Sequence, residues 1–182
     1  MRVIGGKYKS RVLAQFAGEN VRPTSDRARE ALFNMLALKI PNARVLDLFC
    51  GSGAIGIESL SRGAKEVVFN DFSKDSVAIV KKNLNALNVK IGEEARVTQY
   101  DYAVCLDMQK QPFDFIFIDP PYRLEVGVQA VKEIARRGLL AEGGVVVFER
   151  DKPLDEAIDG LFVSSVRKYG KAYLTFLTGE KE

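Results

Sequence analysis

The feature that most constrains the fold is a regular alternation of short apolar segments and longer amphipathic ones after residue 40. The apolar segments predict strands over residues 44–48, 66–70, 95–99, 113–118 and 145–149, and the amphipathic ones predict helices over 54–62, 73–87 and 126–137. Residues 162–167 and 172–177 flank a turn and predict a closing hairpin. Because strand–helix repeats build parallel sheets with helices on both faces, we expect an α/β, Rossmann-like fold with seven mostly parallel strands, the last one antiparallel.

The first 40 residues follow a different pattern. Basic and apolar residues on either side of Gly5 and Gly6 indicate a small hairpin over residues 2–4 and 11–14. Apolar residues at helical spacing then predict a helix that packs on the rest of the chain: Ala28, Ala31, Leu32, Met35 and Leu36. We expect a docked extension over residues 1–40 and a main domain over 41–182.

Composition excludes several kinds of chemistry. The chain has no histidine and only two cysteines, which argues against histidine acid–base catalysis, ordinary zinc sites and a disulfide framework. Its N-terminus lacks the apolar stretch of a signal peptide, and its apolar runs are too short to span a bilayer. These features favour a cytoplasmic protein that holds no metal.

The basic residues are unevenly distributed. Residues 1–30 carry seven Lys or Arg and three Asp or Glu, whereas the rest of the chain carries 20 basic and 21 acidic residues. Basic arms bind nucleic acid by displacing counterions from phosphates. An ordinary solvated surface is the alternative interpretation.

A glycine-rich turn, Gly51-Ser52-Gly53, follows the first predicted strand and opens a helix. Such a turn lets the backbone approach a ligand closely. Asp71 ends the second strand, where its carboxylate can accept both hydroxyls of an adenosine ribose. Asp47, just before the turn, would attract the ammonium group of a bound methionine. The combination favours S-adenosylmethionine.

Two other interpretations of this turn remain open. Gly51, Gly53 and Gly56 also satisfy the spacing of a dinucleotide site, although Asp47 would repel a pyrophosphate and little chain remains for a substrate domain. The turn can also be purely structural. Asp101, after the third strand, either accepts the adenine amino group or caps a short helix.

The most specific signal is Asp119-Pro120-Pro121-Tyr122, directly after the buried fourth strand. The prolines donate no hydrogen bonds, so the exposed groups are acceptors, namely the Asp119 carboxylate and the Pro120 carbonyl. Together with the Tyr122 ring, they suit a planar base that bears an exocyclic amine. Holding both N–H groups would aim the nitrogen lone pair at a methyl donor. The alternative is a proline-rich loop that only closes the strand.

These motifs resemble the Rossmann-type amino-methyltransferases that act on nucleic acid bases. More closely, the chain resembles the bacterial 16S ribosomal RNA guanine-N2 methyltransferase family from residue 2 to about 177. The further residues that carry this resemblance are the segments 2–6, 22–27 and 60–63 together with Arg29, Glu30, Phe33 and Asn34. The resemblance implies methyl transfer from S-adenosylmethionine to a guanine of small-subunit ribosomal RNA, free or in an assembling subunit. Ser10 and Tyr102 depart from the family's smaller residues.

Carried onto this chain, the resemblance implies two groups of site residues. Cofactor contacts are expected from Thr24, Asp47, Cys50, Gly51, Ser52, Gly53, Asp71, Phe72, Asp101 and Tyr102. The catalytic corner comprises Asp119, Pro120, Pro121 and Tyr122. The basic excess of the N-terminal segment adds to the resemblance the expected RNA contacts, which are Arg2, Lys7, Lys9, Arg11, Arg22 and Arg27.

Three alternative functions remain. Adenine-N6 methylation of RNA or DNA uses the same Asp119 motif. A non-catalytic RNA-binding protein of ribosome assembly could use the same scaffold. A nicotinamide-dependent oxidoreductase would use the glycine turn differently, and cofactor binding would distinguish it.

Overall fold

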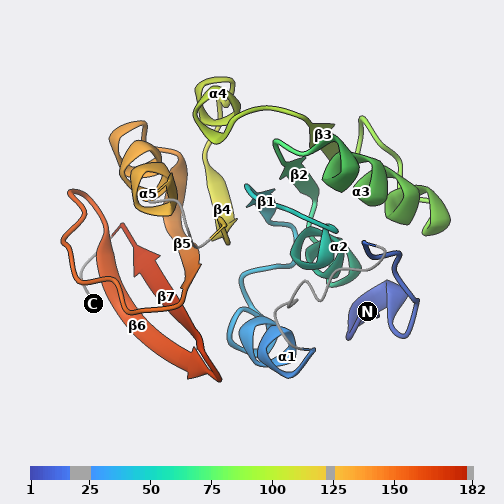
Figure 1. Cartoon of the computed structure of the whole chain (residues 1–182), viewed down its shortest axis with the longest axis horizontal. Coiled ribbons are helices and arrows are strands. Elements are labelled where there is room, and N and C mark those ends of the chain that lie inside the picture. Colours follow the sequence, from blue (N-terminus) through green and yellow to red (C-terminus); the bar gives the residue numbers. More distant parts are fainter. Residues whose placement is uncertain (17–25, 122–125, 180–182) are drawn as a thin grey trace.

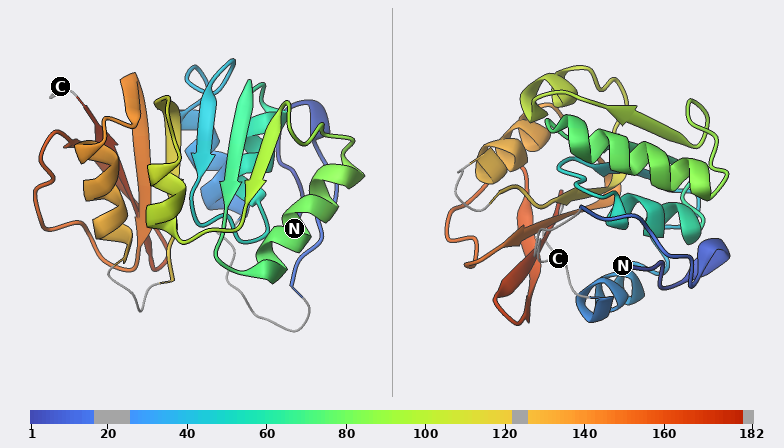
Figure 2. Two further views of the ribbon diagram at one scale, coloured as in Figure 1. Left: turned by 90° about the horizontal axis from the view of Figure 1, so that it is seen from above. Right: turned by 45° about the vertical axis from the view of Figure 1, so that its right-hand side comes forward.

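The computed structural model describes residues 1–16, 26–121 and 126–179. Within these residues seven strands form one sheet in the order β3-β2-β1-β4-β5-β7-β6, with helices on both sides (Figures 1 and 2). The strands are β1 (Arg44–Asp47), β2 (Glu66–Asn70), β3 (Ala95–Thr98), β4 (Phe113–Ile118), β5 (Leu140–Arg150), β6 (Phe162–Tyr169) and β7 (Ala172–Thr178). The expected Rossmann-like α/β architecture is confirmed.

The first five strands are parallel to one another, and β7 pairs antiparallel with both β5 and β6. The run of apolar residues in β4 is buried on both faces, as expected for a central parallel strand. Asp47, the last residue of β1, pairs in register with Phe69 of β2 and Phe117 of β4. The carboxyl ends of the central strands therefore meet at one edge of the sheet.

The helices connect and cover the strands. They are η1 (Gly6–Tyr8), α1 (Asp26–Met35), α2 (Ala54–Ser61), α3 (Lys74–Ala86), α4 (Tyr102–Asp107) and α5 (Val126–Arg136). One core cluster fills the space between the sheet, α1, α2 and α3, and a second lies on the side of α4 and α5. None of the described helices is long and apolar enough to cross a membrane.

Two elements differ from the sequence expectation. Helix α4 is the short helix that Asp101 would cap in the alternative interpretation of that residue. The Asp101 side chain does cap this helix, because it accepts a hydrogen bond from the N–H of Ala103 at 2.9 Å. Strand β5 begins at Leu140, five residues before the predicted start. Leu140 pairs with Phe113, and the register then shifts before Phe115 pairs with Val145. This irregularity interrupts the apolar pattern from which the strand was predicted.

The N-terminal segment forms the expected antiparallel pairing, with Arg2 bridged to Val12. It docks on the end of α2 through a turn at Gly5 and Gly6. Gly6 has a φ of +73°, and a Cβ built on it would lie 1.8 Å from the Ser61 carbonyl oxygen. Only glycine fits so tight an approach in this backbone conformation.

Buried polar groups hold this segment in place. The Glu58 carboxylate, 1% exposed, accepts hydrogen bonds from the N–H groups of Ile4 and Gly5, both at 2.8 Å. The side chain of Asn83 on α3 exchanges hydrogen bonds with the backbone of Ala14 and also donates to the carbonyl of Ser52 at 3.1 Å. The N-terminal segment is therefore connected to α2 and to the glycine turn.

Candidate cofactor and active site

The glycine turn leaves open space beside its backbone. Gly51 has a φ of +51°, and a Cβ built on it would meet no atom within 4 Å. Gly53 has a φ of +79°, and a Cβ built on it would instead lie 3.0 Å from a methyl group of Val80. Gly51 therefore offers a place where a ligand can approach the main chain, and Gly53 allows the helix to pack closely.

Asp71 connects the loops that follow β1 and β2. Its carboxylate accepts hydrogen bonds from the N–H of Gly51 at 2.8 Å and from the N–H of Ser73 at 2.9 Å. Each carboxylate oxygen can accept a second hydrogen bond. Asp71 can therefore hold the turn and still receive hydroxyl groups from a ligand.

Asp47 is almost completely buried below the turn. Its carboxylate accepts a hydrogen bond from the N–H of Gly56 in α2 at 2.9 Å. Burial, with a smaller contribution from the nearby charge of Asp71, raises its pKa to about 7 against the effect of this hydrogen bond. A cationic group of a ligand beside Asp47 would favour the charged form and lower this pKa again.

The remaining residues predicted to contact a cofactor have diverse surroundings. Cys50 is buried, and burial raises the pKa of its thiol well above the ordinary value, so the thiol stays protonated. The Phe72 ring is 77% exposed next to Asp71 and presents a flat apolar surface. The half-buried Tyr102 ring packs against Phe49 with the ring centroids 5.9 Å apart. Thr24 lies outside the described residues.

The predicted catalytic corner follows β4 at the same edge of the sheet. Asp119 directly follows the strand, Pro120 is buried and Pro121 is exposed, while Tyr122 lies outside the described residues. Burial raises the pKa of Asp119 well above its ordinary value, and the charges of Glu149 and then Asp47 raise it further. A carboxyl group in these surroundings takes up a proton more readily than a free one.

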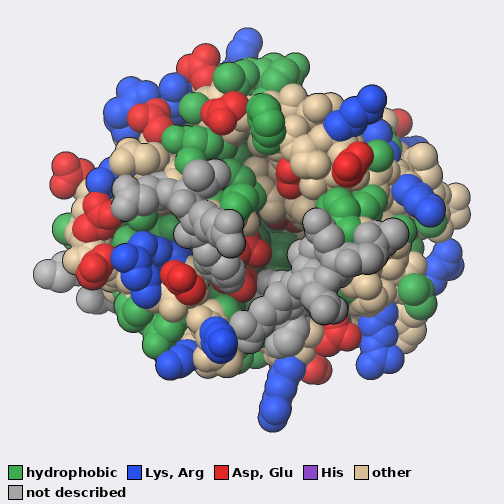
Figure 3. All heavy atoms as spheres, viewed as in Figure 1, with side chains coloured by type: hydrophobic (Ala, Val, Ile, Leu, Met, Phe, Trp, Pro, Cys, Tyr) green, Lys and Arg blue, Asp and Glu red, His purple; other side chains and the backbone are tan. Residues whose placement is uncertain are grey.

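Sequence reasoning missed Glu149. This side chain is 4% exposed, and the preceding residue, Phe148, pairs with Ile118 of β4. Glu149 therefore lies beside Asp119 in the next strand of the sheet. Its signal was a carboxylate at the end of an apolar run, the same signal that singled out Asp47 and Asp119. In Figure 3 a hollow with acidic side chains around it lies in the middle of the molecular face that is turned toward the viewer.

The predicted RNA-contacting residues fall into two groups. Arg2, Lys9 and Arg27 line a common pocket between the N-terminal segment and α1. Lys7 instead forms an ion pair with Glu94 at 3.2 Å, and Arg11 donates to the carbonyl of Ala86 at 3.0 Å. Arg22 lies outside the described residues. Among the residues that the structure describes, no group of three or more Asp, Glu, Cys or His side chains is placed to hold a metal ion.

Comparison with known proteins gives consistent matches over the chain. Residues 1–178 match the family described as "Conserved hypothetical protein 95". The "Ribosomal RNA small subunit methyltransferase D" of Haemophilus influenzae is 36% identical over 157 residues, which cover 85% of this chain and 81% of that protein. The protein of the same name from Escherichia coli is 35% identical over 151 residues, which cover 83% of this chain and 75% of that protein.

Solved structures give a similar match. A candidate methyltransferase of Escherichia coli superimposes with a TM-score of 0.87 and 30% identity. The match covers 97% of this chain and 96% of that one, so it includes the N-terminal segment as well as the sheet.

Proposed function

The chain belongs to the family described as "Conserved hypothetical protein 95", and on this basis we propose that it is an S-adenosylmethionine-dependent methyltransferase of small-subunit ribosomal RNA. Its target in this proposal is the exocyclic N2 amine of a guanine. The names of its relatives support ribosomal RNA as the substrate class. The guanine-N2 assignment comes from the sequence resemblance and the chemistry of the Asp119 corner.

One observation carries the proposal: Asp47 ends β1, while Asp71 and Asp119 directly follow the neighbouring strands β2 and β4, so all three lie at one edge of the sheet near the open backbone of Gly51. Ligands of open α/β sheets bind at this edge. A ligand that carries a ribose and a cationic amino acid end but no phosphate suits these carboxylates. When bound, S-adenosylmethionine supplies an electrophilic methyl group on a positively charged sulfur.

Each residue then has a defined task. Asp71 accepts ribose hydroxyls, and Asp47 attracts the ammonium group. Asp119 and the Pro120 carbonyl accept the two N–H groups of the target amine, and Tyr122 stacks on the base. Catalysis in this arrangement comes mainly from positioning and charge placement.

The N-terminal 40 residues form the RNA-binding extension in this proposal, and residues 41–182 form the methyltransferase domain. Arg2, Lys7, Lys9, Arg11, Arg22 and Arg27 contact RNA phosphates. Docking of this segment through Glu58 and Asn83 supports a rigid arrangement of the two parts.

The test is to incubate the protein with methyl-labelled S-adenosylmethionine and unmodified small-subunit RNA, both free and assembled with its proteins. Digestion to nucleosides should then give labelled N2-methylguanosine. Labelled N6-methyladenosine would show that the alternative target is correct. Retention of RNA without any labelled nucleoside on either substrate would favour a non-catalytic assembly protein.

A further inference from the structure

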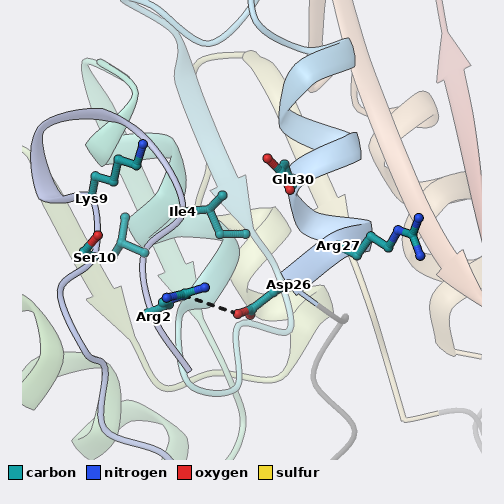
Figure 4. Close-up of a pocket in the computed structure, with 8 residues that line it drawn as sticks. Arg2, Ile4, Lys9, Ser10, Asp26, Arg27 and Glu30 are labelled. Carbon is teal, nitrogen blue, oxygen red and sulfur yellow. Dashed lines mark ion pairs between the residues drawn. The ribbon is translucent and has the colours of Figure 1, made fainter.

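A pocket of about 350 Å³ lies between the N-terminal segment and the start of α1, outside the strand edge described above (Figure 4). Arg2, Val3, Ile4, Lys9 and Ser10 line it from one side, and Asp26, Arg27 and Glu30 from the other. Its volume falls within the range of about 300–1,000 Å³ that is typical of small-molecule sites.

The base of the pocket is held by buried interactions. Arg29, whose side chain is 1% exposed, donates to the carbonyl of Arg2 and forms an ion pair with Asp26 at 3.0 Å. Arg2 approaches Asp26 at 3.9 Å from the solvent side. The negative charge of Asp26 is therefore already neutralised, and the backbone of Arg2 is fixed.

Two charged side chains in the pocket remain available. Lys9 and Glu30 are exposed, and neither side chain forms a hydrogen bond or an ion pair with another residue that the structure describes. In Figure 4 Glu30 and Ile4 point toward one another across the gap, whereas Arg27 extends away from it. The pocket thus offers the Lys9 ammonium group, the Glu30 carboxylate and the apolar side chain of Ile4.

We propose that this pocket binds one guanosine nucleotide of the RNA, separate from the nucleotide that is methylated, and that Glu30 recognises its base. This inference rests on the proposed function, because it assumes an RNA substrate. Lys9 would contact the phosphate, and Ser10 can hydrogen-bond the ribose 2′-hydroxyl. Ile4 would contact the sugar or the base face.

The choice of guanine follows from its hydrogen-bond donors. Its N1–H and N2–H groups point the same way, so they match the two oxygens of a carboxylate, which only accepts hydrogen bonds. Adenine and cytosine place an acceptor nitrogen beside their amino group, and uracil flanks its single N–H with carbonyl oxygens. Each of these bases would set an acceptor against an oxygen of Glu30.

The experiment uses the full chain and 12-nucleotide oligouridine RNAs that contain one central guanosine or one central adenosine. We expect the guanosine RNA to bind at least tenfold more tightly, and Glu30→Gln to remove this preference. Glu142→Gln is the matched control, since Glu142 is also an exposed glutamate but lies in β5. Equal binding of the two RNAs, or a preference that Glu30→Gln leaves intact, would overturn the proposal.

Two further arms separate the possible sources of a guanine preference. The preference should persist in Asp119→Ala; its loss there would place guanine recognition at the methylation corner and overturn the pocket assignment. Free 5′-GMP should bind far more weakly than the guanosine RNA, and equal affinity would overturn the assignment to RNA.

Ribosomal RNA methylation without the guanine preference would refute this pocket alone. The preference without any methyl transfer would refute the proposed activity alone.

Discussion

The carboxylate of Asp71 accepts a hydrogen bond from the backbone N–H of Gly51 at 2.8 Å, although the two residues follow different strands. The contact joins the loop after β1 to the loop after β2. It also orients the carboxylate beside the open space at Gly51. The same side chain can therefore shape the turn and bind the ribose of a cofactor.

This double role predicts that Asp71→Ala weakens cofactor binding. A hydrogen bond to a charged group contributes about 1.5–3 kcal/mol, so the dissociation constant of S-adenosylhomocysteine should rise about tenfold or more. Isothermal titration calorimetry measures this directly. Asp75→Ala is a suitable control, because Asp75 is exposed in the first turn of α3. Unchanged affinity in Asp71→Ala would contradict the ribose assignment, and tight binding of NAD would contradict the cofactor assignment.

Asp47 is predicted to reduce the stability of the free protein at high pH. Burial raises its pKa to about 7, so the folded state favours the protonated form. The stability this provides is present below the ordinary pKa near 4 and is lost as the pH rises through about 7. Asp47→Asn does not titrate, so its stability relative to the unchanged protein should increase with pH.

The change expected at Asp47 is large enough to measure. Raising the pKa of Asp47 from its ordinary 3.8 to about 7 corresponds to about 4 kcal/mol at most. Urea unfolding at pH 5 and pH 8 without cofactor should show the relative gain of Asp47→Asn, and cofactor binding should weaken. A stability difference that is identical at both pH values would contradict the pKa argument.

The sheet could be predicted from the sequence because its strands are short apolar runs with a local pattern. The alternation placed β1, β2, β3 and β4 close to their observed bounds, and the parallel order then brought Asp47, Asp71 and Asp119 to one edge. The same argument could have predicted Glu149 as a site residue. It could not have predicted the register shift in β5, because that shift depends on pairing with Phe113 rather than on the local pattern.

Contacts between distant segments could not be predicted in this way. In the sequence Glu58 and Asn83 resemble ordinary polar residues of surface helices, yet both are buried and bind the N-terminal backbone. The N-terminal backbone groups that Glu58 binds lie more than 50 residues away in the sequence. No local pattern records such a pairing, so the manner of docking became visible only in the structure.

The N-terminal arm is predicted to bind RNA phosphates unequally. Replacing Arg2, Lys7, Lys9 and Arg11 together with Ala should lower the slope of log binding constant against log salt by up to about 3–4, if each side chain meets a phosphate. Among the single variants, Lys9→Ala should have a larger effect than Lys7→Ala, because Lys7 is already paired with Glu94. Filter binding of RNA over a range of salt concentrations measures the slopes. An unchanged slope in the quadruple variant would mean that the basic arm is only a solvated surface.

Tyr122 is predicted to act through its ring. Tyr122→Phe keeps the flat surface, so most activity should survive. Tyr122→Ala removes a stacking contact of about 1–3 kcal/mol with an extruded base and should strongly reduce turnover of RNA. Initial rates of methyl incorporation compare the two variants. If Tyr122→Phe were as inactive as Tyr122→Ala, the hydroxyl group would be the working part of the side chain.

Asp119 is predicted to be needed for turnover but not for cofactor binding. Asp119→Ala leaves Asp47 and Asp71 in place, so the affinity for S-adenosylhomocysteine should stay near normal. Loss of the acceptor that orients the amine should lower turnover about 10²-fold or more. Full activity in this variant would mean that the amine is held elsewhere.

The surroundings of Asp119 also predict how activity depends on pH. Burial and the charge of Glu149 raise the pKa of Asp119, and the acceptor role requires the deprotonated carboxylate. Turnover should therefore rise with pH through this raised pKa and then level off. Glu149→Gln removes a neighbouring negative charge while keeping the size of the side chain, so the pKa of Asp119 should fall and the rising limb should move to lower pH. A purely structural role for Glu149 would lower the plateau without moving the limb. A limb that stays in place in Glu149→Gln would therefore show that the two carboxylates are not coupled during turnover.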